Sequence, residues 1–285
     1  MDVNKDNIAV SALYTAATWH WAGLANADTV TPANAHGVFK LVNAYMVFYR
    51  WLNPRSYSLP YQLLHRHSAI DYLLKHSGCQ RVIEVACGFS PRAATFSADP
   101  ACWYVEMDLP AMIAHKQAQL EASAAGRAIL ARPNLQLRAG DITTHDFAAD
   151  AGNAPTAIIT EGLMMYFNRE QQLPIWRSIA TALQASDGLY LFDYIPLSEE
   201  PPRSWLGRML HHVRVHWFGI VGDFAYDNRD RDAVAADLRR CGFSHVQCHV
   251  TGEVADAWGL PSGKVPTRTL IYACRVLSAV AGERS

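Results

Sequence analysis

The residues whose types and spacing suggest chemistry follow two buried strands. The apolar run Val82–Val85 predicts the first strand, which ends in the small-residue turn Ala86–Gly88. Ser90 and Pro91 then predict a helix start, with the serine as N-cap and the proline at the first helical position. A second apolar run ends in Asp108, about 20 residues beyond the turn, where an acidic side chain can bind a ribose. The pattern indicates a site for a cofactor that contains a nucleoside.

The turn itself is a degenerate form of a dinucleotide-binding fingerprint. Such a fingerprint has glycine at three small positions, whereas Ala86 and Ser90 occupy two of them here. Gly88 remains where the backbone must come close to the ligand. Without a pyrophosphate to bind, the other glycines are less necessary, which favours S-adenosylmethionine as the cofactor. The alternative is an ordinary tight turn between a strand and a helix.

Composition narrows the function classes. Half of the 285 residues are hydrophobic and 18% are charged, so the chain can bury a sizeable core. The net charge of -1 provides no basic surface for nucleic acid or an anionic membrane, and we expect neither as a partner. The six cysteines form no CxxC pair, which favours reduced core thiols in a cytoplasmic protein.

The N-terminal region has a helical pattern. Its segment Ile8–Ala25 lacks Lys, Arg, Asp and Glu, but it contains polar residues and is too short and mixed for a membrane span. We therefore expect a buried helix. The predicted domains are an N-terminal helical cap over residues 1–78 and a cofactor-binding domain over residues 79–285, with a lid insertion at 198–229.

From residue 81 onward, strands and helices alternate, which favours a largely parallel sheet with helices on both faces. Two successive strands at the C-terminal end suggest that the last strand is antiparallel. The predicted strands are Val82–Ala86, Cys102–Met107, Leu135–Arg138, Thr156–Thr160, Leu189–Tyr194, His245–Val250 and Thr269–Val276. The predicted helices are Ile8–Leu24, Ala35–Leu52, Tyr61–His76, Pro91–Ser97, Pro110–Ala124, Arg169–Ala185 and Asp230–Cys241.

Five sequence blocks together resemble the leucine carboxyl methyltransferase family, and within it the bacterial branch of the tetracenomycin type, which methylates natural-product carboxylates. The resemblance implies an α/β, Rossmann-like class I methyltransferase fold with a seven-stranded, mostly parallel sheet. It also implies S-adenosyl-L-methionine as the cofactor. The blocks are Ser11–Thr15, Arg66–Asp71, Glu84–Arg92, Tyr104–Pro110 with Lys116 downstream, and Thr160–Tyr166.

The resemblance assigns roles to individual residues. Arg66 matches the arginine that holds the cofactor's carboxylate, and a guanidinium can bind both of its oxygens. Gly88 matches the turn that contacts the methionine portion. Asp108 matches the acid that binds the ribose hydroxyls, with Glu106 as the neighbouring alternative. The full set of expected cofactor-binding residues is Arg66, Glu84, Gly88, Asp108, Leu109, Asp141, Ile142 and Glu161.

Three of these positions have plainer alternatives. Asp141 and Ile142 match the pair that recognises the adenine amino group, but Asp141 could instead cap a helix. Glu161 matches an acid that faces the sulfonium, but it could be an ordinary acid at a helix start. Arg66 could be a surface arginine of a helix.

The acceptor is less well defined than the cofactor. A carboxylate is already a nucleophile at neutral pH, whereas a phenol benefits from a general base. His211, His212 and His216 are the candidate bases, with packing or surface roles as the alternative. No metal site is predicted, because no third ligand accompanies the last two histidines.

The leading hypothesis is a methyltransferase that acts on a carboxylate or hydroxyl of a small molecule, in secondary metabolism. A catalytically silent cofactor-binding partner protein is a second hypothesis, and an NAD-dependent oxidoreductase is a third. The missing glycines and the Thr160–Tyr166 block argue against the third. The oligomeric state stays open.

Overall fold

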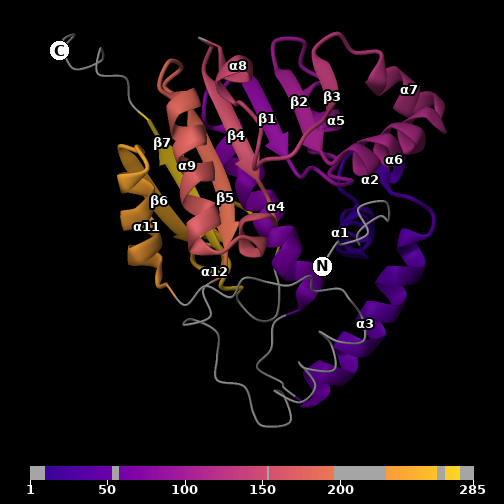
Figure 1. Ribbon diagram of the computed structural model, residues 1–285. Coiled ribbons are helices and arrows are strands. Elements are labelled where there is room, and N and C mark those ends of the chain that lie inside the picture. The colour runs from indigo at the N-terminus through magenta and orange to yellow at the C-terminus, as the bar shows by residue number, and fades with distance from the viewer. Residues whose placement is uncertain (1–9, 53–57, 153, 196–228, 262–266, 277–285) are drawn as a thin grey trace.

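The computed structural model describes residues 10–52, 58–152, 154–195, 229–261 and 267–276. Its centre is a seven-stranded sheet with the strand order β3-β2-β1-β4-β5-β7-β6 (Figure 1). β7 is antiparallel to β5 and β6, and the other neighbours are parallel. The strands are β1 (Arg81–Val85), β2 (Trp103–Asp108), β3 (Leu135–Ala139), β4 (Thr156–Thr160), β5 (Leu189–Tyr194), β6 (His245–Val250) and β7 (Leu270–Arg275).

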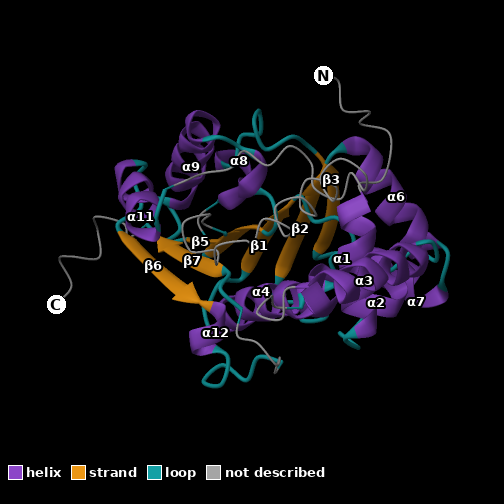
Figure 2. Cartoon of the chain, turned by 90° about the horizontal axis from the view of Figure 1, so that it is seen from below, coloured by secondary structure: helices purple, strands orange, loops and turns teal. Residues whose placement is uncertain are grey.

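Helices cover both faces of this sheet. Figure 2 shows α8, α9 and α11 on one side and α4 and α12 on the other. The N-terminal helices are α1 (Val10–Trp21), α2 (Ala27–Val30), α3 (Ala35–Leu52) and α4 (Leu59–Lys75). The later helices are α5 (Arg92–Phe96), α6 (Pro110–Glu121), α7 (Ala124–Leu130), α8 (Ala148–Ala151), the 3-10 turn η1 (Met164–Tyr166), α9 (Arg169–Leu183), α11 (Arg231–Arg240) and α12 (Thr251–Val254).

The expected mostly parallel sheet with an antiparallel last strand is confirmed, and each strand end lies within one residue of its prediction. In the described part of the chain, the ends of the predicted helices agree with the structure to within three residues, and two of the differences have a clear local cause. The helix expected over Pro110–Ala124 ends at Glu121, because the Ser123 side chain caps a new helix by accepting a hydrogen bond from the Gly126 N–H. A Cβ on Gly126 would lie 2.0 Å from the Leu120 carbonyl oxygen, so only glycine fits this corner.

The start of α5 also differs from the prediction. Pro91, rather than Ser90, is the N-cap residue, and the first helical residue is Arg92. The Ser90 hydroxyl still accepts a 3.3 Å hydrogen bond from the Arg92 N–H. The serine therefore stabilises the helix start from one residue further away than expected.

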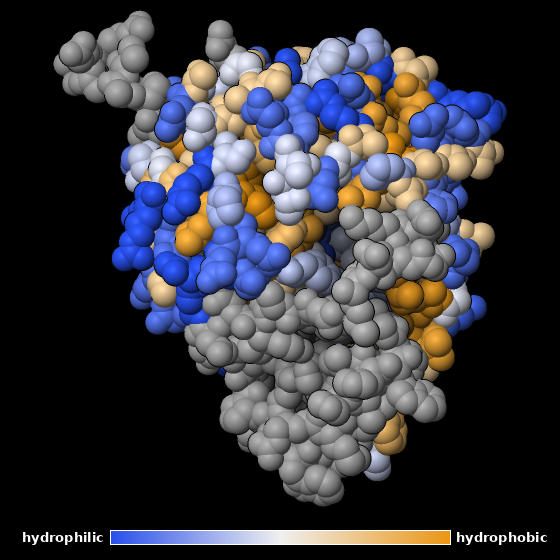
Figure 3. Space-filling model, viewed as in Figure 1, coloured by the Kyte–Doolittle hydropathy of each residue, from blue (hydrophilic) through white to orange (hydrophobic). Residues whose placement is uncertain are grey.

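The core consists of two layers, one on each face of the sheet. Successive residues of a strand point to opposite faces. In β4, Ile158 packs in the cluster that contains Trp176 of α9, whereas Ile159 packs in the cluster that contains Ile70 of α4. On the outside, the surface of α11 is largely hydrophilic (Figure 3), and its exposed residues include Arg239.

α1 and α3 pack mainly against each other, whereas Val30 of α2 packs with Leu120 of α6 and Ile129 of α7. α4 contacts both α1 and the strands β5 and β7. Tyr14 of α1 and Val42 of α3 lie in a separate apolar cluster that also includes Leu64 of α4. The position of the boundary at residue 78 stays a prediction, as does the lid insertion, since residues 196–228 lie outside the described part of the chain. Within the described residues, no helix combines the length and apolar character that a membrane crossing requires.

We predict that Ile158→Ala lowers the free energy of unfolding by about 2–5 kcal/mol, because it opens a cavity in a fully buried central strand. Val47→Ala, at a position on α3 that is 68% exposed, should change stability by less than about 0.5 kcal/mol. Urea unfolding monitored by circular dichroism measures both values. Equal values for the two variants would contradict the layered core.

Candidate functional site

Four acidic side chains are buried on the sheet face that α4 covers. Each acid lies two positions along the chain from an apolar residue that packs in the same cluster as Ile70 of α4. Because alternate residues of a strand point to the same face, the acids lie on the face of the sheet that α4 covers. Buried carboxylates need cationic partners or hydrogen bonds, because burial removes their hydration. The four are Glu84 of β1, Glu106 of β2, Glu161 directly after β4, and Asp193 of β5.

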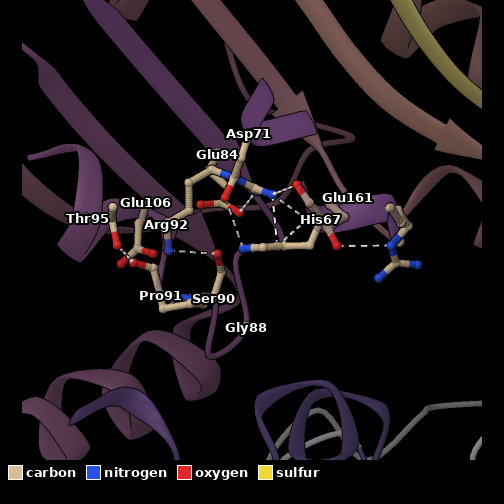
Figure 4. A network of polar contacts seen from close by, with 12 residues as sticks. His67, Asp71, Glu84, Gly88, Ser90, Pro91, Arg92, Thr95, Glu106 and Glu161 are labelled. Atoms are coloured by element: carbon tan, nitrogen blue, oxygen red, sulfur yellow. Dashed lines mark hydrogen bonds and ion pairs between the residues drawn. The ribbon is translucent and has the colours of Figure 1, made fainter. Parts of the chain in front are cut away.

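Arg92 is the central cation of this cluster (Figure 4). Its side chain is fully buried at the start of α5, and its guanidinium donates to Glu84, Asp71 and Glu161. The distance from Nη2 to Glu161 Oε2 is 2.7 Å. Burial alone would lower the pKa of Arg92, but these carboxylates raise it well above the usual value, so the cation is retained. Arg92 thereby connects the turn that contains Gly88 to β1, α4 and the end of β4.

Glu161 receives donors on both carboxylate oxygens. Oε1 accepts from Arg66 Nε at 3.0 Å, and Oε2 lies 2.9 Å from His67 Nδ1 as well as accepting from Arg92. The His67 ring packs on Trp19 of α1, with 4.3 Å between ring centroids. Although burial opposes ionisation, His67, Arg92 and Arg66 hold the pKa of Glu161 well below its usual range. Glu161 is therefore a fixed negative charge rather than a proton acceptor.

Arg66 lies beside Glu161 and has a second acidic partner. Its Nη1 atom donates to Asp193 Oδ2 at 3.3 Å. The guanidinium also lies against the backbone of Gly162, where a Cβ would be 3.0 Å from Nη2. In the described part of the chain, no side chain accepts a hydrogen bond from Nη2. The edge formed by Nη1 and Nη2 can therefore receive a carboxylate.

Asp108 and Gly88 meet at the ends of β1 and β2. The Gly88 N–H donates to Asp108 Oδ2 and the Leu109 N–H donates to Oδ1, both at 2.8 Å. Each oxygen keeps a further lone pair, so the oriented carboxylate can still accept from two hydroxyls. Burial raises the pKa of Asp108, and the two backbone N–H donors counteract that shift. Asp108 is less buried than Glu106, as expected for a residue nearer the strand end.

The neighbouring Glu106 is occupied by another partner. It forms a buried ion pair with Lys116 of α6, and Lys116 Nζ also donates to the Ser90 carbonyl at 2.9 Å. Burial raises the pKa of Glu106 to about 7. The pair links the turn that contains Gly88 and Ser90 to β2. It leaves Asp108 as the better-placed acid for a ligand.

The remaining predicted residues lie in different settings. Glu84 is 1% exposed and accepts from both Arg92 and the Tyr104 hydroxyl, so it can act on a ligand only through other residues. Asp141 Oδ1 accepts from the N–H and hydroxyl of Thr143 within a turn, and Ile142 is part of the core. The capping alternative for Asp141 is wrong, because the next helix, α8, begins only at Ala148. The candidate bases lie outside the described residues; they are His211, His212 and His216.

Sequence reasoning missed Arg92, His67 and Asp193 as members of the site. Arg92 and His67 lie inside two of the blocks that carry the family resemblance, but nothing local shows which carboxylates they contact. Asp193 interrupts the apolar run of β5, and a buried acid in such a run is the available signal. Among the described residues, no group of three His, Cys, Asp or Glu side chains is arranged to hold a metal ion.

We predict that Arg92→Met lowers the free energy of unfolding by about 3–5 kcal/mol, because it leaves buried carboxylates without their cation. The matched control is Arg240→Met, whose side chain is 72% exposed beside Asp237 and should contribute about 1 kcal/mol or less. Guanidinium unfolding curves measure the difference. If Arg92→Met lowered the free energy of unfolding no more than Arg240→Met does, the Arg92 cation would be dispensable for stability.

A second prediction concerns pH. The pKa of Glu161 is lower in the folded protein than in the unfolded chain, so its stabilisation is present above the unfolded value of about 4.3 and is lost as pH falls toward the folded value. The stability difference between the wild type and Glu161→Gln should therefore be largest near neutral pH and shrink in acid. Unfolding at a series of pH values tests this. The exposed Glu121→Gln should show no such trend, and a pH-independent difference for Glu161→Gln would contradict the assignment.

The sequence model of the family "leucine carboxyl methyltransferase" matches residues 48–180, a little under half of the chain. This stretch contains Arg66, Gly88, Asp108 and Glu161. The match supports the expected enzyme class, a S-adenosylmethionine-dependent methyltransferase, and the expected cofactor. No curated protein matches the sequence.

Solved structures resemble the chain at low sequence identity. A candidate O-methyltransferase from Nostoc punctiforme has a TM-score of 0.52 and 15% identity, over 81% of this chain and 59% of the other. A possible exported protein from Bordetella parapertussis has a TM-score of 0.50 and 17% identity, over 75% and 67%. The S-adenosylmethionine-dependent methyltransferase SibL has a TM-score of 0.48 and 18% identity, over 85% and 59%.

The chain thus spans about three fifths of the length of the Nostoc punctiforme and SibL structures. At these identities the likeness concerns the fold, and it confirms the expected class I methyltransferase architecture. The resemblance to the leucine carboxyl methyltransferase family is confirmed over residues 48–180.

Proposed function

We propose that this chain is a S-adenosylmethionine-dependent O-methyltransferase that methylates a carboxylate or hydroxyl of a small molecule, in secondary metabolism. One observation carries the proposal: residues that the family resemblance assigns to the cofactor come from separate segments and meet in two contacting pairs. Arg66 contacts Glu161, and Gly88 contacts Asp108. Arg92 joins the pairs, because it follows the Gly88 turn and donates to Glu161.

The donors and acceptors of this site fit the parts of the cofactor. The open Nη1/Nη2 edge of Arg66 suits the carboxylate of the methionine portion. The remaining lone pairs of Asp108 suit two ribose hydroxyls. Leu109, which is 36% exposed beside Asp108, offers an apolar surface for the adenine.

The charge of the site also supports a cationic ligand. In the network around Arg92 and Arg66, two guanidinium groups face four carboxylates, so negative charge is in excess. These carboxylates belong to Asp71, Glu84, Glu161 and Asp193. When bound, S-adenosylmethionine supplies a methyl group on a positively charged sulfur, which keeps the electron pair of the broken bond. Glu161 contributes a fixed charge close to that position, and it is already oriented before the ligand binds.

The proposed acceptor is an oxygen nucleophile. Glu161 is unsuited to removing a proton, because three cationic or imidazole groups engage it. A carboxylate acceptor is ionised at neutral pH and needs no base, whereas a hydroxyl acceptor would need one. The three candidate histidines lie outside the described residues, so their role stays a prediction. The cytoplasmic location and the absence of nucleic-acid and membrane partners also stay predictions.

We predict that Asp108→Ala weakens binding of S-adenosylhomocysteine by about 2–3 kcal/mol, because two charge-assisted hydrogen bonds to the ribose are lost. The matched control is Asp99→Ala, an exposed aspartate that accepts a hydrogen bond from the Ala101 N–H. It should leave binding unchanged. Isothermal titration measures both affinities.

The same titration separates the competing hypotheses. Binding of NAD without binding of S-adenosylhomocysteine would overturn the proposal. Turnover of methyl-labelled cofactor against a panel of small carboxylic acids and phenols tests the transfer itself and identifies the accepting oxygen. Cofactor binding without turnover on any acceptor would favour a silent binding protein.

A further inference from the structure

We propose that Asp193 and Gly162 form a positioning pair that directs the open edge of Arg66 toward the carboxylate of the cofactor. The inference rests on the proposed function and extends it to two residues without an assigned role. Asp193 is fully buried near the end of β5. Its Oδ1 accepts from the Gly162 N–H at 2.5 Å and its Oδ2 accepts from Arg66 Nη1 at 3.3 Å.

Arg66 is held at two points that come from neighbouring strands. Its Nε atom donates to Glu161, which follows β4, and its Nη1 atom donates to Asp193 of β5. Two contacts on a planar group fix both its position and the direction of its free edge. With Nε and one hydrogen of Nη1 engaged, the edge that includes Nη2 is left for a ligand. Glu161 and Asp193 therefore determine which N–H groups of Arg66 stay available to a ligand.

Gly162 supplies the third constraint. Its φ is +69°, a left-handed conformation that favours glycine. A Cβ at this position would lie 3.0 Å from Arg66 Nη2, 3.2 Å from Nη1 and 3.3 Å from Cζ. The guanidinium thus lies closely against the turn, and a side chain on residue 162 would push it away.

A purely structural role does not explain why residue 193 is an acid. A neutral acceptor could receive the Gly162 N–H at a smaller desolvation cost than a buried carboxylate. Burial indeed raises the pKa of Asp193, which Arg66 and the Gly162 N–H counteract. The negative charge is useful because it faces a cation. This points to Arg66 as the group that Asp193 serves.

Asp193 and Gly162 should affect only one portion of the bound cofactor. Asp193 and Gly162 contact Arg66 but not Asp108, so they should affect recognition of the amino-acid portion and leave recognition of the nucleoside portion unchanged. S-Adenosylhomocysteine carries both portions. 5′-Methylthioadenosine carries the nucleoside and a short thioether without the carboxylate. The ratio of their affinities reports on recognition of the amino-acid portion, whose carboxylate Arg66 is proposed to bind.

We predict that Asp193→Asn weakens binding of S-adenosylhomocysteine about tenfold or more, while binding of 5′-methylthioadenosine stays within about twofold. Gly162→Ala should change the ratio in the same direction, and it retains Asp193. The control is Tyr190→Phe, which removes a buried 2.7 Å hydrogen bond to Thr160 between the same two strands but does not contact Arg66. Titration of both ligands into variants with native circular dichroism spectra gives the ratios.

A double-mutant cycle links the effect to Arg66. On an Arg66→Ala background, Asp193→Asn should cause no further loss of S-adenosylhomocysteine binding. An equal weakening of both ligands, an unchanged ratio, or full additivity in the cycle would overturn the positioning role while the proposed function stands. Failure of the wild type to bind S-adenosylhomocysteine would overturn the proposed function, and the positioning role with it.

Discussion

The burial of carboxylates on one face of the sheet is the constraint on which the rest of the site depends. Isolated carboxylates could not remain ionised there, so cations must reach them from other elements. Arg92 arrives from the start of α5 and Arg66 from α4. Their ion pairs therefore fix the strand ends, the turn that contains Gly88 and α4 relative to one another. The same contacts that satisfy the buried charges also shape the edge where the ligand is proposed to bind.

The proposed site has two halves, and the ion-pair network around Arg92 connects them. In the proposed site, the nucleoside half contains Asp108, whose carboxylate is oriented by the backbone N–H groups of Gly88 and Leu109. The amino-acid half consists of Arg66 and Glu161, oriented by side chains from α4, α5 and β5. Backbone groups suit the first half because a tight turn already exposes them. The second half lies over the buried sheet face, where charged side chains must supply the orientation.

The sequence predicted the strands and the ends that carry Asp108 and Glu161, because apolar runs and turn residues are local signals. It did not predict the partners of Arg92, since an ion pair such as Arg92 with Glu161 joins residues 69 positions apart. The alternation within each strand could have grouped the buried acids on one face, but it could not show which cations meet them. Ala86 is another instance: with a φ of 55°, it adopts the left-handed conformation that the missing glycine would favour. The turn thus has a backbone conformation typical of glycine, although alanine occupies the position.

The excess of negative charge has a consequence for the proposed reaction. A site with four carboxylates and two guanidinium groups favours a ligand that brings positive charge. Transfer of the methyl group removes the charge on sulfur, so the product interacts less favourably with Glu161 than the methyl donor does. A carboxylate that was neutralised by protonation would not make this distinction, and the cations around Glu161 prevent its protonation at neutral pH. In the proposed reaction, the network that stabilises the fold would thus also favour binding of the donor over retention of the product.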